Sequence, residues 1–464
     1  MSNNDNSNNN NSNNNIEQEI EESQRRTNQK VRQFVQISFE REATNQVAVL
    51  KETIDTDNSD TSASTSSTTP NLNNEYDTIY VSGCSSSVGT VIKVEALSRQ
   101  RNYNSLDCNN KAVAALGLNS ILDLSSTYPH SQATLFTRGQ WKQLRARFPC
   151  RKYDTDQYSS ILEPLNIIST IYDDRSSFDI NWIKLYKELK QLRNKYDPNI
   201  QPEHNDTGFC IDLLLHILST VKHQPHLFND GIGVSEWDYI VKFWGVVTER
   251  LFHHSDLRLK WGDTHLTVSD TISDLLLKVD MRVLHDSVRQ RFNVETDLGV
   301  LEAAEEDPGD VKYTSDRCKV TIESKAIIDK FVLDGCLIDS VDSLQVSGLE
   351  LHFGRTTLAR PGLYVADQFH TTAIDKSLNN ISRYFDLACH LLCFRDQCIQ
   401  IYNKYEDHLT NSRTKKTATK RNIQDLPEDE LVLKQNYIRG SWSPPRTSKT
   451  TPPPPPKKLF GTTE

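Results

Sequence analysis

The chain has 464 residues, with 53 basic and 62 acidic side chains and a formal net charge of −9 at pH 7. This balance excludes an overall basic field that would draw the protein to nucleic acid or anionic lipid, so any nucleic-acid contact would need a local basic patch. No apolar run approaches the roughly 18 residues of a membrane span, and the polar N-terminus contains no secretory segment, so we expect no membrane partner.

Polar and proline-rich tracts occupy both ends of the sequence. "MSNNDNSNNNNSNNN" and "TDNSDTSASTSSTTPNLNN" contain too little apolar surface to offset the entropic cost of ordering, so residues 1–75 are predicted to form a disordered Asn/Ser-rich tail. Residues 411–464 are predicted to form a second disordered tail, basic and Pro-rich. Between the tails we expect a mixed, largely helical subregion over 76–170 and a core domain over 171–410.

The first folded segments combine one short strand with helices. In "DTIYVSG", Ile79 and Val81 alternate with polar residues, which predicts a strand. "SGCSSSVGT" follows it as a phosphate-binding loop would, but its glycine spacing differs and it has no Lys, which favours a simple turn. "NKAVAALGLNSILDL" and "TRGQWKQLRARF" are both predicted helices.

Three helices are predicted next. "FDINWIKLYKELKQLRNKYD" has apolar residues at helical spacing, namely Ile183, Tyr186, Leu189 and Leu192. "FCIDLLLHILSTVKH" is apolar all round and should be buried. "SEWDYIVKFWGVVTERLF" begins with Ser235 as N-cap and has Asp238 three residues on, a capping-box variant. Its predicted core face consists of Ile240, Phe243, Val247 and Leu251.

The stretch "LLLKVDMRVLHD", residues 275–286, has a strand pattern. Its alternate positions are all apolar: Leu275, Leu277, Val279, Met281 and Val283. The other face carries Lys278, Asp280 and Arg282, which predicts either a solvated face with weak ion pairs or one half of a metal site. "TDLGVLEAA", residues 296–304, is a second predicted strand, with Glu302 near its end.

A helix from Ser315 to Gly335 and two more strands complete the core. The strands "LELHFGRTTL" and "GLYVADQF" are joined through a Pro361-Gly362 turn, and the helix "NNISRYFDLACHLLCFRDQCIQIYNKY" follows them. Residues 235–369 are therefore expected to order as helix, strand, strand, helix, strand, strand. This order predicts an α/β (α+β) fold in which a mixed sheet is flanked by helices.

That order resembles the restriction-endonuclease-like core of the PD-(D/E)XK nuclease-like superfamily. The resemblance implies that Asp280 and Glu302 bind Mg²⁺, a hard cation that prefers oxygen ligands, with Glu236 as an assisting acid of the preceding helix. It also implies a metal-dependent nuclease, in which the metal polarises the phosphodiester and activates water while a Lys positions the attacking hydroxide.

One departure from the motif is serious, because Ala304 stands where the superfamily has Lys. A lysine of the following helix could supply the amine, and Lys319 is a better candidate than Lys312 or Lys325 because it lies near the helix start and close to the Glu302 strand. Without such a replacement, the site would bind a metal weakly and cleave nothing. We therefore favour a noncatalytic or degenerate nuclease-like protein that acts through binding, with the metal-dependent nuclease as the alternative.

The stretch from "SEWDYIVKFWGVVTERLF" to "LARPGLYV" also resembles a group of proteins common in zygomycete moulds. This group has no assigned activity, so the second resemblance implies no function.

Cysteines and histidines give weaker signals. The nine cysteines form no CxxC pair, which indicates a reducing compartment and an intracellular protein of the nucleus or cytoplasm. Cys389 and Cys393 share a predicted helix face, where we expect small buried hydrophobes. "FHHSDLRLKWGDTH" lacks the i,i+4 histidine spacing of a zinc protease, which favours surface residues around a turn.

The C-terminal tail carries short interaction motifs. Pro453, Pro456 and Lys458 fit the PxxPxK spacing bound by Src-homology-3-type domains. "KKLF" is similar to a cyclin-docking motif, Ser443-Pro444 and Thr451-Pro452 are candidates for proline-directed phosphorylation, and "RTKKTATKR" would serve as a nuclear-import signal or a patch for nucleic-acid phosphates. Such motifs match by chance often, and the alternative is a solubilising tail.

Overall fold

The computed structural model of the chain describes residue 77 and residues 79–125, 131–228, 233–266, 278–289, 292–306, 309–379, 381–418 and 437–442. The tail predicted for residues 1–75 and the motif residues Pro453, Pro456 and Lys458 lie outside these ranges.

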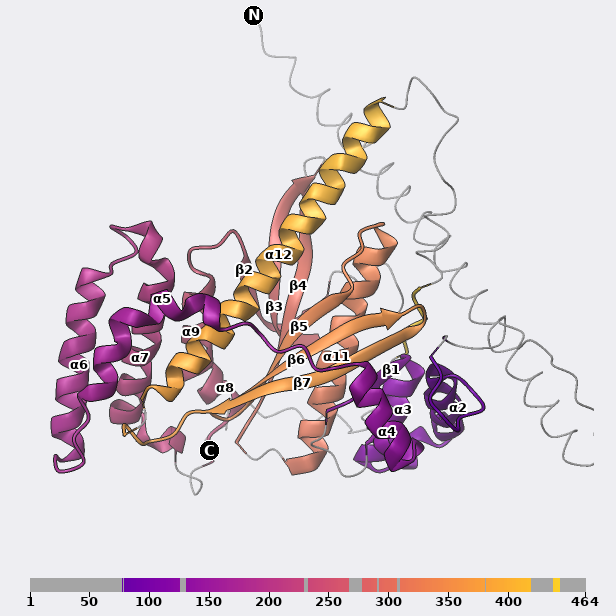
Figure 1. Cartoon of the computed structure of the whole chain (residues 1–464), viewed down its shortest axis with the longest axis horizontal. Coiled ribbons are helices and arrows are strands. Elements are labelled where there is room, and N and C mark those ends of the chain that lie inside the picture. The colour runs from indigo at the N-terminus through magenta and orange to yellow at the C-terminus, as the bar shows by residue number, and fades with distance from the viewer. Residues whose placement is uncertain are drawn as a thin grey trace, which may run out of the picture.

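One mixed seven-stranded sheet forms the centre of the described structure, in the order β1-β7-β6-β5-β4-β3-β2 (Figure 1). The strands are β1 (Ile121–Asp123), β2 (Arg258–His265), β3 (Lys278–Arg289), β4 (Phe292–Ala304), β5 (Ser340–Ser347), β6 (Glu350–Arg360) and β7 (Leu363–Ala373). The pairs β4–β5 and β1–β7 are parallel, whereas the other neighbours are antiparallel. The predicted α/β architecture, a mixed sheet flanked by helices, is confirmed.

Helices cover both faces of the sheet, with α12 in front of it and α11 behind it in Figure 1. The α-helices are α2 (Val88–Gln100), α3 (Cys108–Leu118), α4 (Arg138–Arg147), α5 (Ser159–Leu162), α6 (Phe178–Lys195), α7 (Asn205–His223), α8 (Glu236–Tyr239), α9 (Gly245–Phe252), α11 (Gly309–Leu333) and α12 (Arg383–Ala418). Within the described ranges, none of them combines the length and hydropathy that a bilayer crossing needs.

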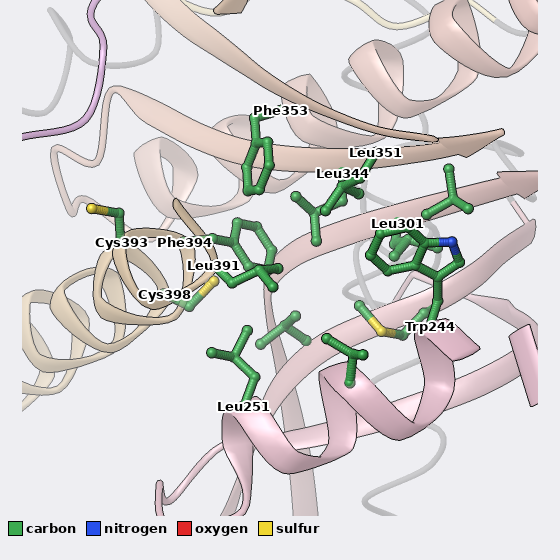
Figure 2. Packing of buried hydrophobic residues seen from close by; sticks show 14 of the residues in the cluster. Trp244, Leu251, Leu301, Leu344, Leu351, Phe353, Leu391, Cys393, Phe394 and Cys398 are labelled. Carbon is green, nitrogen blue, oxygen red and sulfur yellow. The ribbon is translucent and has the colours of Figure 1, made fainter. Parts of the chain in front are cut away.

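The main apolar core lies between the sheet and α9 and α12 (Figure 2). Strand residues that alternate along the sheet supply one side of it, among them Leu301, Leu344 and Phe353. Trp244 fills the core from the helical side, and its indole nitrogen donates to the backbone oxygen of Gly348 at 2.8 Å. Since side chains alternate across a strand, the residues between these core positions point to the opposite face, toward α11.

The helix predicted from Ser235 contains an irregular turn. The Ser235–Asp238 capping box is confirmed, and the four predicted core residues are buried. Between α8 and α9, however, residues Ile240–Trp244 form a π-helical turn that the amphipathic pattern did not predict. An added Cβ on Gly245 would lie 2.7 Å from the carbonyl oxygen of Ile240, so glycine permits the backbone contact that closes this wider turn.

Several predicted elements differ near the N-terminal end. The strand expected at Ile79 and Val81 is wrong: both residues are buried in irregular backbone, and Asp77 accepts hydrogen bonds from the amides of Ile79 and Gly89 instead. The helix expected over "NKAVAALGLNSILDL" ends at Leu118. Ser120 has a positive φ of 58°, which redirects the chain into β1.

Two strands and one helix face also differ from the expectations. β5 was not predicted, because its six inner residues are buried on both faces and leave no clear alternation, and β2 was not recognised as a strand. In α6, Ile183 is 46% exposed, while Leu185 and Leu189 are buried. The expected stripe in α6 was therefore partly wrong.

The C-terminal boundary lies further along the chain than predicted. α12 continues to Ala418, into the segment predicted to be a tail. Residues 437–442 then return to the core, where Tyr437, Ile438 and Trp442 pack against buried residues. Asn119 holds this returning segment through two hydrogen bonds to the backbone of Trp442, each 2.9 Å long.

Gly117 should be the least replaceable glycine of the α2–α3 contact. A Cβ there would lie 2.5 Å from the backbone oxygen of Ile92 and 2.6 Å from the Cβ of Ala96. We expect Gly117→Ala to lower the free energy of unfolding by about 1–3 kcal/mol, because the helices must separate. Denaturant unfolding measures the change, with Gly139→Ala in α4 as the control, since nothing lies within 4 Å of its added Cβ. An equal effect of both substitutions would contradict the close-packing argument.

Candidate functional site

Asp280 and Glu302 lie opposite each other on the antiparallel strands β3 and β4, as the register beside the Met281–Leu301 pair requires. Glu302 Oε1 lies 3.4 Å from the backbone nitrogen of Asp280, and Asp280 Oδ2 accepts a 2.9 Å hydrogen bond from the backbone of Ala303. Both acids are on the face covered by α11. The structure therefore brings together the two acids that the sequence singled out as one pair.

Lys319 reaches this pair from α11. Its Nζ lies 2.5 Å from Glu302 Oε2, and Glu302 is only 1% exposed. Of the three lysines considered for the missing motif amine, Lys319 is the one that contacts Glu302. Lys325 lies elsewhere, in a buried ion pair with Asp329.

Glu236 and Lys312 form the outer part of the same site. Lys312 Nζ donates to Glu236 Oε2 at 3.1 Å, to Asp316 Oδ2 at 3.0 Å and to the backbone oxygen of Ala303 at 3.2 Å. Glu236, at the start of α8, is thus connected to β4 through the Lys312 ammonium group. One ammonium surrounded by three oxygens indicates that this position suits a cation.

Two further acids of α11 complete the site, and the sequence analysis did not identify them. Asp316 and Glu323 stand three residues before and four residues after Lys319, on the same helix face. The sequence spacing predicts that Asp316, Lys319 and Glu323 share one helix face. No local pattern, however, predicts that this face contacts Asp280 and Glu302. We refer to Glu236, Asp280, Glu302, Asp316 and Glu323 as the acid cluster.

Three oxygen atoms at the site lack a hydrogen-bond donor in the described part of the chain. Glu323 is fully buried, and neither of its carboxylate oxygens has a hydrogen-bond partner. Gln345 of β5 is in register beside Glu302, and its Oε1 is likewise buried without a donor. Buried acceptors usually find partners, so these oxygens are the atoms to which a proton or a cation would bind.

Four acids of the cluster, Glu236, Glu302, Asp316 and Glu323, have pKa values above those of ordinary carboxyl groups. Burial raises the pKa of Glu302 to about 8, and the nearby charge of Asp280 adds to this effect while Lys319 opposes it. Burial and the charge of Glu302 raise the pKa of Glu323 well above its ordinary value, and burial also raises the pKa values of Glu236 and Asp316. The cluster is therefore partly protonated at neutral pH, since its carboxyl groups outnumber Lys312 and Lys319.

The donor set fits a hard divalent cation such as Mg²⁺ or Mn²⁺, which prefers carboxylate, amide and carbonyl oxygens. The unpartnered oxygens of Glu323 and Gln345 are of this kind. Within the described residues, however, no three acids of the cluster bring oxygens within 4.8 Å of one another. Since Lys319 contacts Glu302, a bound cation would require this ammonium group to shift.

Comparison with family models, with curated proteins and with solved structures finds no match for this chain.

Glu302→Gln should flatten the pH dependence of stability. The raised pKa means that the folded chain binds this proton more tightly than the unfolded chain, whose ordinary pKa is 4.5, so the stabilisation is complete below that pH and is lost as pH rises through about 8. Without this titrating group, the unfolding temperature should fall less between about pH 5 and about pH 8 than it does in the wild type. The control is Glu305→Gln, an exposed position three residues on, which should keep the wild-type slope. If the unfolding temperature of Glu302→Gln depends on pH as steeply as that of the wild type, Glu302 is not the group that titrates.

Proposed function

We propose that the site around Asp280, Glu302 and Lys319 cleaves phosphodiester bonds with the help of a divalent metal ion. One observation carries the proposal: the amine of Lys319 contacts Glu302, while Asp280 lies opposite on the same sheet face. Lys319 thereby replaces the lysine that is absent at Ala304. The order of elements also supports it, because the helical segment α8–α9 precedes the antiparallel strands β2, β3 and β4, and α11 then leads into β5, parallel to β4.

The roles of the residues follow from their chemistry. Asp280 and Glu302 would hold Mg²⁺, which when bound polarises the phosphodiester and lowers the pKa of its water. Lys319 would orient the attacking water and stabilise negative charge that develops on the phosphoryl oxygens. The water oxygen forms a new bond to phosphorus as the bridging P–O bond breaks, giving a phosphate monoester and a free hydroxyl. Lys312 would position Glu236 beside β4.

A second function is favoured by a different observation. Lys312 and Lys319 already neutralise part of the acid cluster, and its acids do not share one coordination sphere in the described residues. A degenerate site of this kind would bind a partner without cleaving it. In that case, the tail residues Pro453, Pro456 and Lys458 would recruit a Src-homology-3-type or other proline-binding domain. We propose an intracellular location in the nucleus or cytoplasm for either function, and in the described structure none of the nine cysteines forms a disulfide.

A cleavage assay on the full chain separates the two functions. The chelator-treated protein is incubated with single- and double-stranded DNA and RNA, with Mg²⁺, with Mn²⁺ or with no metal. The nuclease proposal expects products only with a divalent ion, and their loss when chelator is restored. Binding of Mn²⁺ without cleavage of any substrate would overturn it and favour the binding function.

A further inference from the structure

Two histidines and an aspartate meet on the sheet face opposite the acid cluster. His370 is on β7, and Asp386 and His390 are one turn apart in α12. Each can offer one ligand atom such that these atoms all lie within 4.8 Å of one another, and among the described residues this is the one group of three that does so. The group is therefore the most compact candidate metal site in the described structure.

Each histidine nitrogen lies near one oxygen of the Asp386 carboxylate, at the distance that separates neighbouring ligands of a tetrahedral metal ion. His370 Nε2 lies 3.2 Å from Asp386 Oδ2, and His390 Nδ1 lies 3.3 Å from Asp386 Oδ1. Zinc bonds of about 2.0–2.1 Å at tetrahedral angles place neighbouring ligand atoms about 3.3 Å apart. Two imidazole nitrogens and one carboxylate oxygen are the donors that Zn²⁺ and similar divalent ions of the first transition row prefer, with one position left open to water.

The surroundings keep His370 neutral and shield part of the group from water. Burial lowers the pKa of His370 to about 4, with the neighbouring His390 and Lys152 acting in the same direction and Asp386 opposing them, so this imidazole is neutral at pH 7. The rings of Tyr153 and Phe353 flank His390, which is 7% exposed. The Asp386 side chain is 52% exposed and gives access from solvent. A neutral imidazole is the form that binds a metal.

Metal entry requires two local changes. The two imidazole rings are stacked, with centroids 3.6 Å apart and 13° between their planes. In this arrangement the nitrogen lone pairs of the two rings are nearly parallel and do not point to one metal position. The less buried His370 ring must therefore tilt. His390 Nδ1 also lies 2.9 Å from the backbone oxygen of Asp386, which can only accept, so this nitrogen carries the proton in the metal-free chain. Ligation through Nδ1 moves that proton to Nε2.

We propose that His370, Asp386 and His390 form a site for Zn²⁺ or a chemically similar divalent transition-metal ion, independent of the acid cluster on the other sheet face. The site has three protein ligands and one open position. It would hold the start of α12 against the end of β7, two segments that only a short connection joins in the chain.

Co²⁺, which reports its coordination by visible absorption, and Zn²⁺ are the probes for this site. The full chain is treated with chelator, dialysed and titrated with each ion, and equilibrium dialysis gives stoichiometry and affinity. We expect one ion per chain with an intense four-coordinate Co²⁺ spectrum and no thiolate charge-transfer bands, in addition to any ion at the acid cluster. The affinity and spectrum of this four-coordinate ion should be unchanged in Asp280→Asn. Asp386→Asn and His370→Ala should each weaken binding about 100-fold, since even the loss of a supporting residue around a ligand costs 10–100-fold.

Two further points make the experiment decisive. Substitution of the buried His390 would disturb the core, so Asp386 is the primary position to change. Asp386 is exposed, and Asp386→Asn keeps the size of its side chain. The surface pair His253 and His254 provides the matched control: replacing both with Ala should leave the affinity unchanged. Wild-type affinity in both Asp386→Asn and His370→Ala, a six-coordinate Co²⁺ spectrum, or no binding at all would each overturn the proposal.

Discussion

Asp280→Asn is expected to lower the metal-dependent cleavage rate about 100-fold or more while the fold stays intact. The substitution removes the carboxylate charge from the pair with Glu302, and electrostatic stabilisation by a bound metal supplies several kcal/mol, at about tenfold in rate per 1.4 kcal/mol. The amide oxygen of Asn can still accept the hydrogen bond from Ala303, so the contact between β3 and β4 should persist. The value of kcat/KM with Mg²⁺ measures the effect, and the unfolding temperature verifies the fold.

The matched control is Asp286→Asn on the same strand. Asp286 forms an exposed ion pair with Arg258, far along β3 from the acid cluster, and exposed pairs contribute little. Its kcat/KM should stay within about twofold of wild type. If Asp280→Asn keeps wild-type activity, cleavage does not depend on the acid cluster and the proposed function is lost.

The acid pair could be predicted from the sequence because it depends on local periodicity. Alternation in β3 separates Asp280 from the apolar stripe, and Glu302 stands near the end of the next strand. Since β3 and β4 are consecutive antiparallel strands, few registers are available, and the register that forms places Asp280 opposite Glu302. Lys319 followed from its position on the next helix, whose start at Gly309 is six residues earlier than the predicted Ser315 cap.

The rest of the site depends on contacts that no local pattern encodes. Asp316 and Glu323 occupy a helix face that would be solvated in most proteins, and only the packing of α11 across the sheet makes it interior. β5 has apolar and polar residues buried alike, so its pattern gives no period. The helix predicted through Asn119 ends at Leu118, and Asn119 instead binds the backbone of Trp442, more than 300 positions away.

Lys325 is a fully buried charged residue outside the acid cluster. Its side chain is 0% exposed, and its Nζ donates to Asp329 Oδ2 at 2.6 Å, to the backbone oxygen of Arg439 at 2.9 Å and to Ser441 Oγ at 2.8 Å. The ring of Tyr364 lies 4.8 Å from the ammonium group, and its hydroxyl donates to Asp329. Asp329 supplies the one carboxylate in this set, so the pair fixes both α11 and the returning segment 437–442.

Asp329→Asn should therefore lower the free energy of unfolding by about 3–5 kcal/mol, because it leaves a buried ammonium without a counter-charge. Adding Lys325→Met to Asp329→Asn should recover part of this loss, since neither buried charge then remains. Denaturant unfolding measures both variants. The control is Glu95→Gln, which breaks the partly exposed i,i+4 pair with Arg99 in α2 and should cost at most about 0.5 kcal/mol. A loss below about 1 kcal/mol in Asp329→Asn would mean that water reaches Lys325 and that residues 437–442 do not seal it.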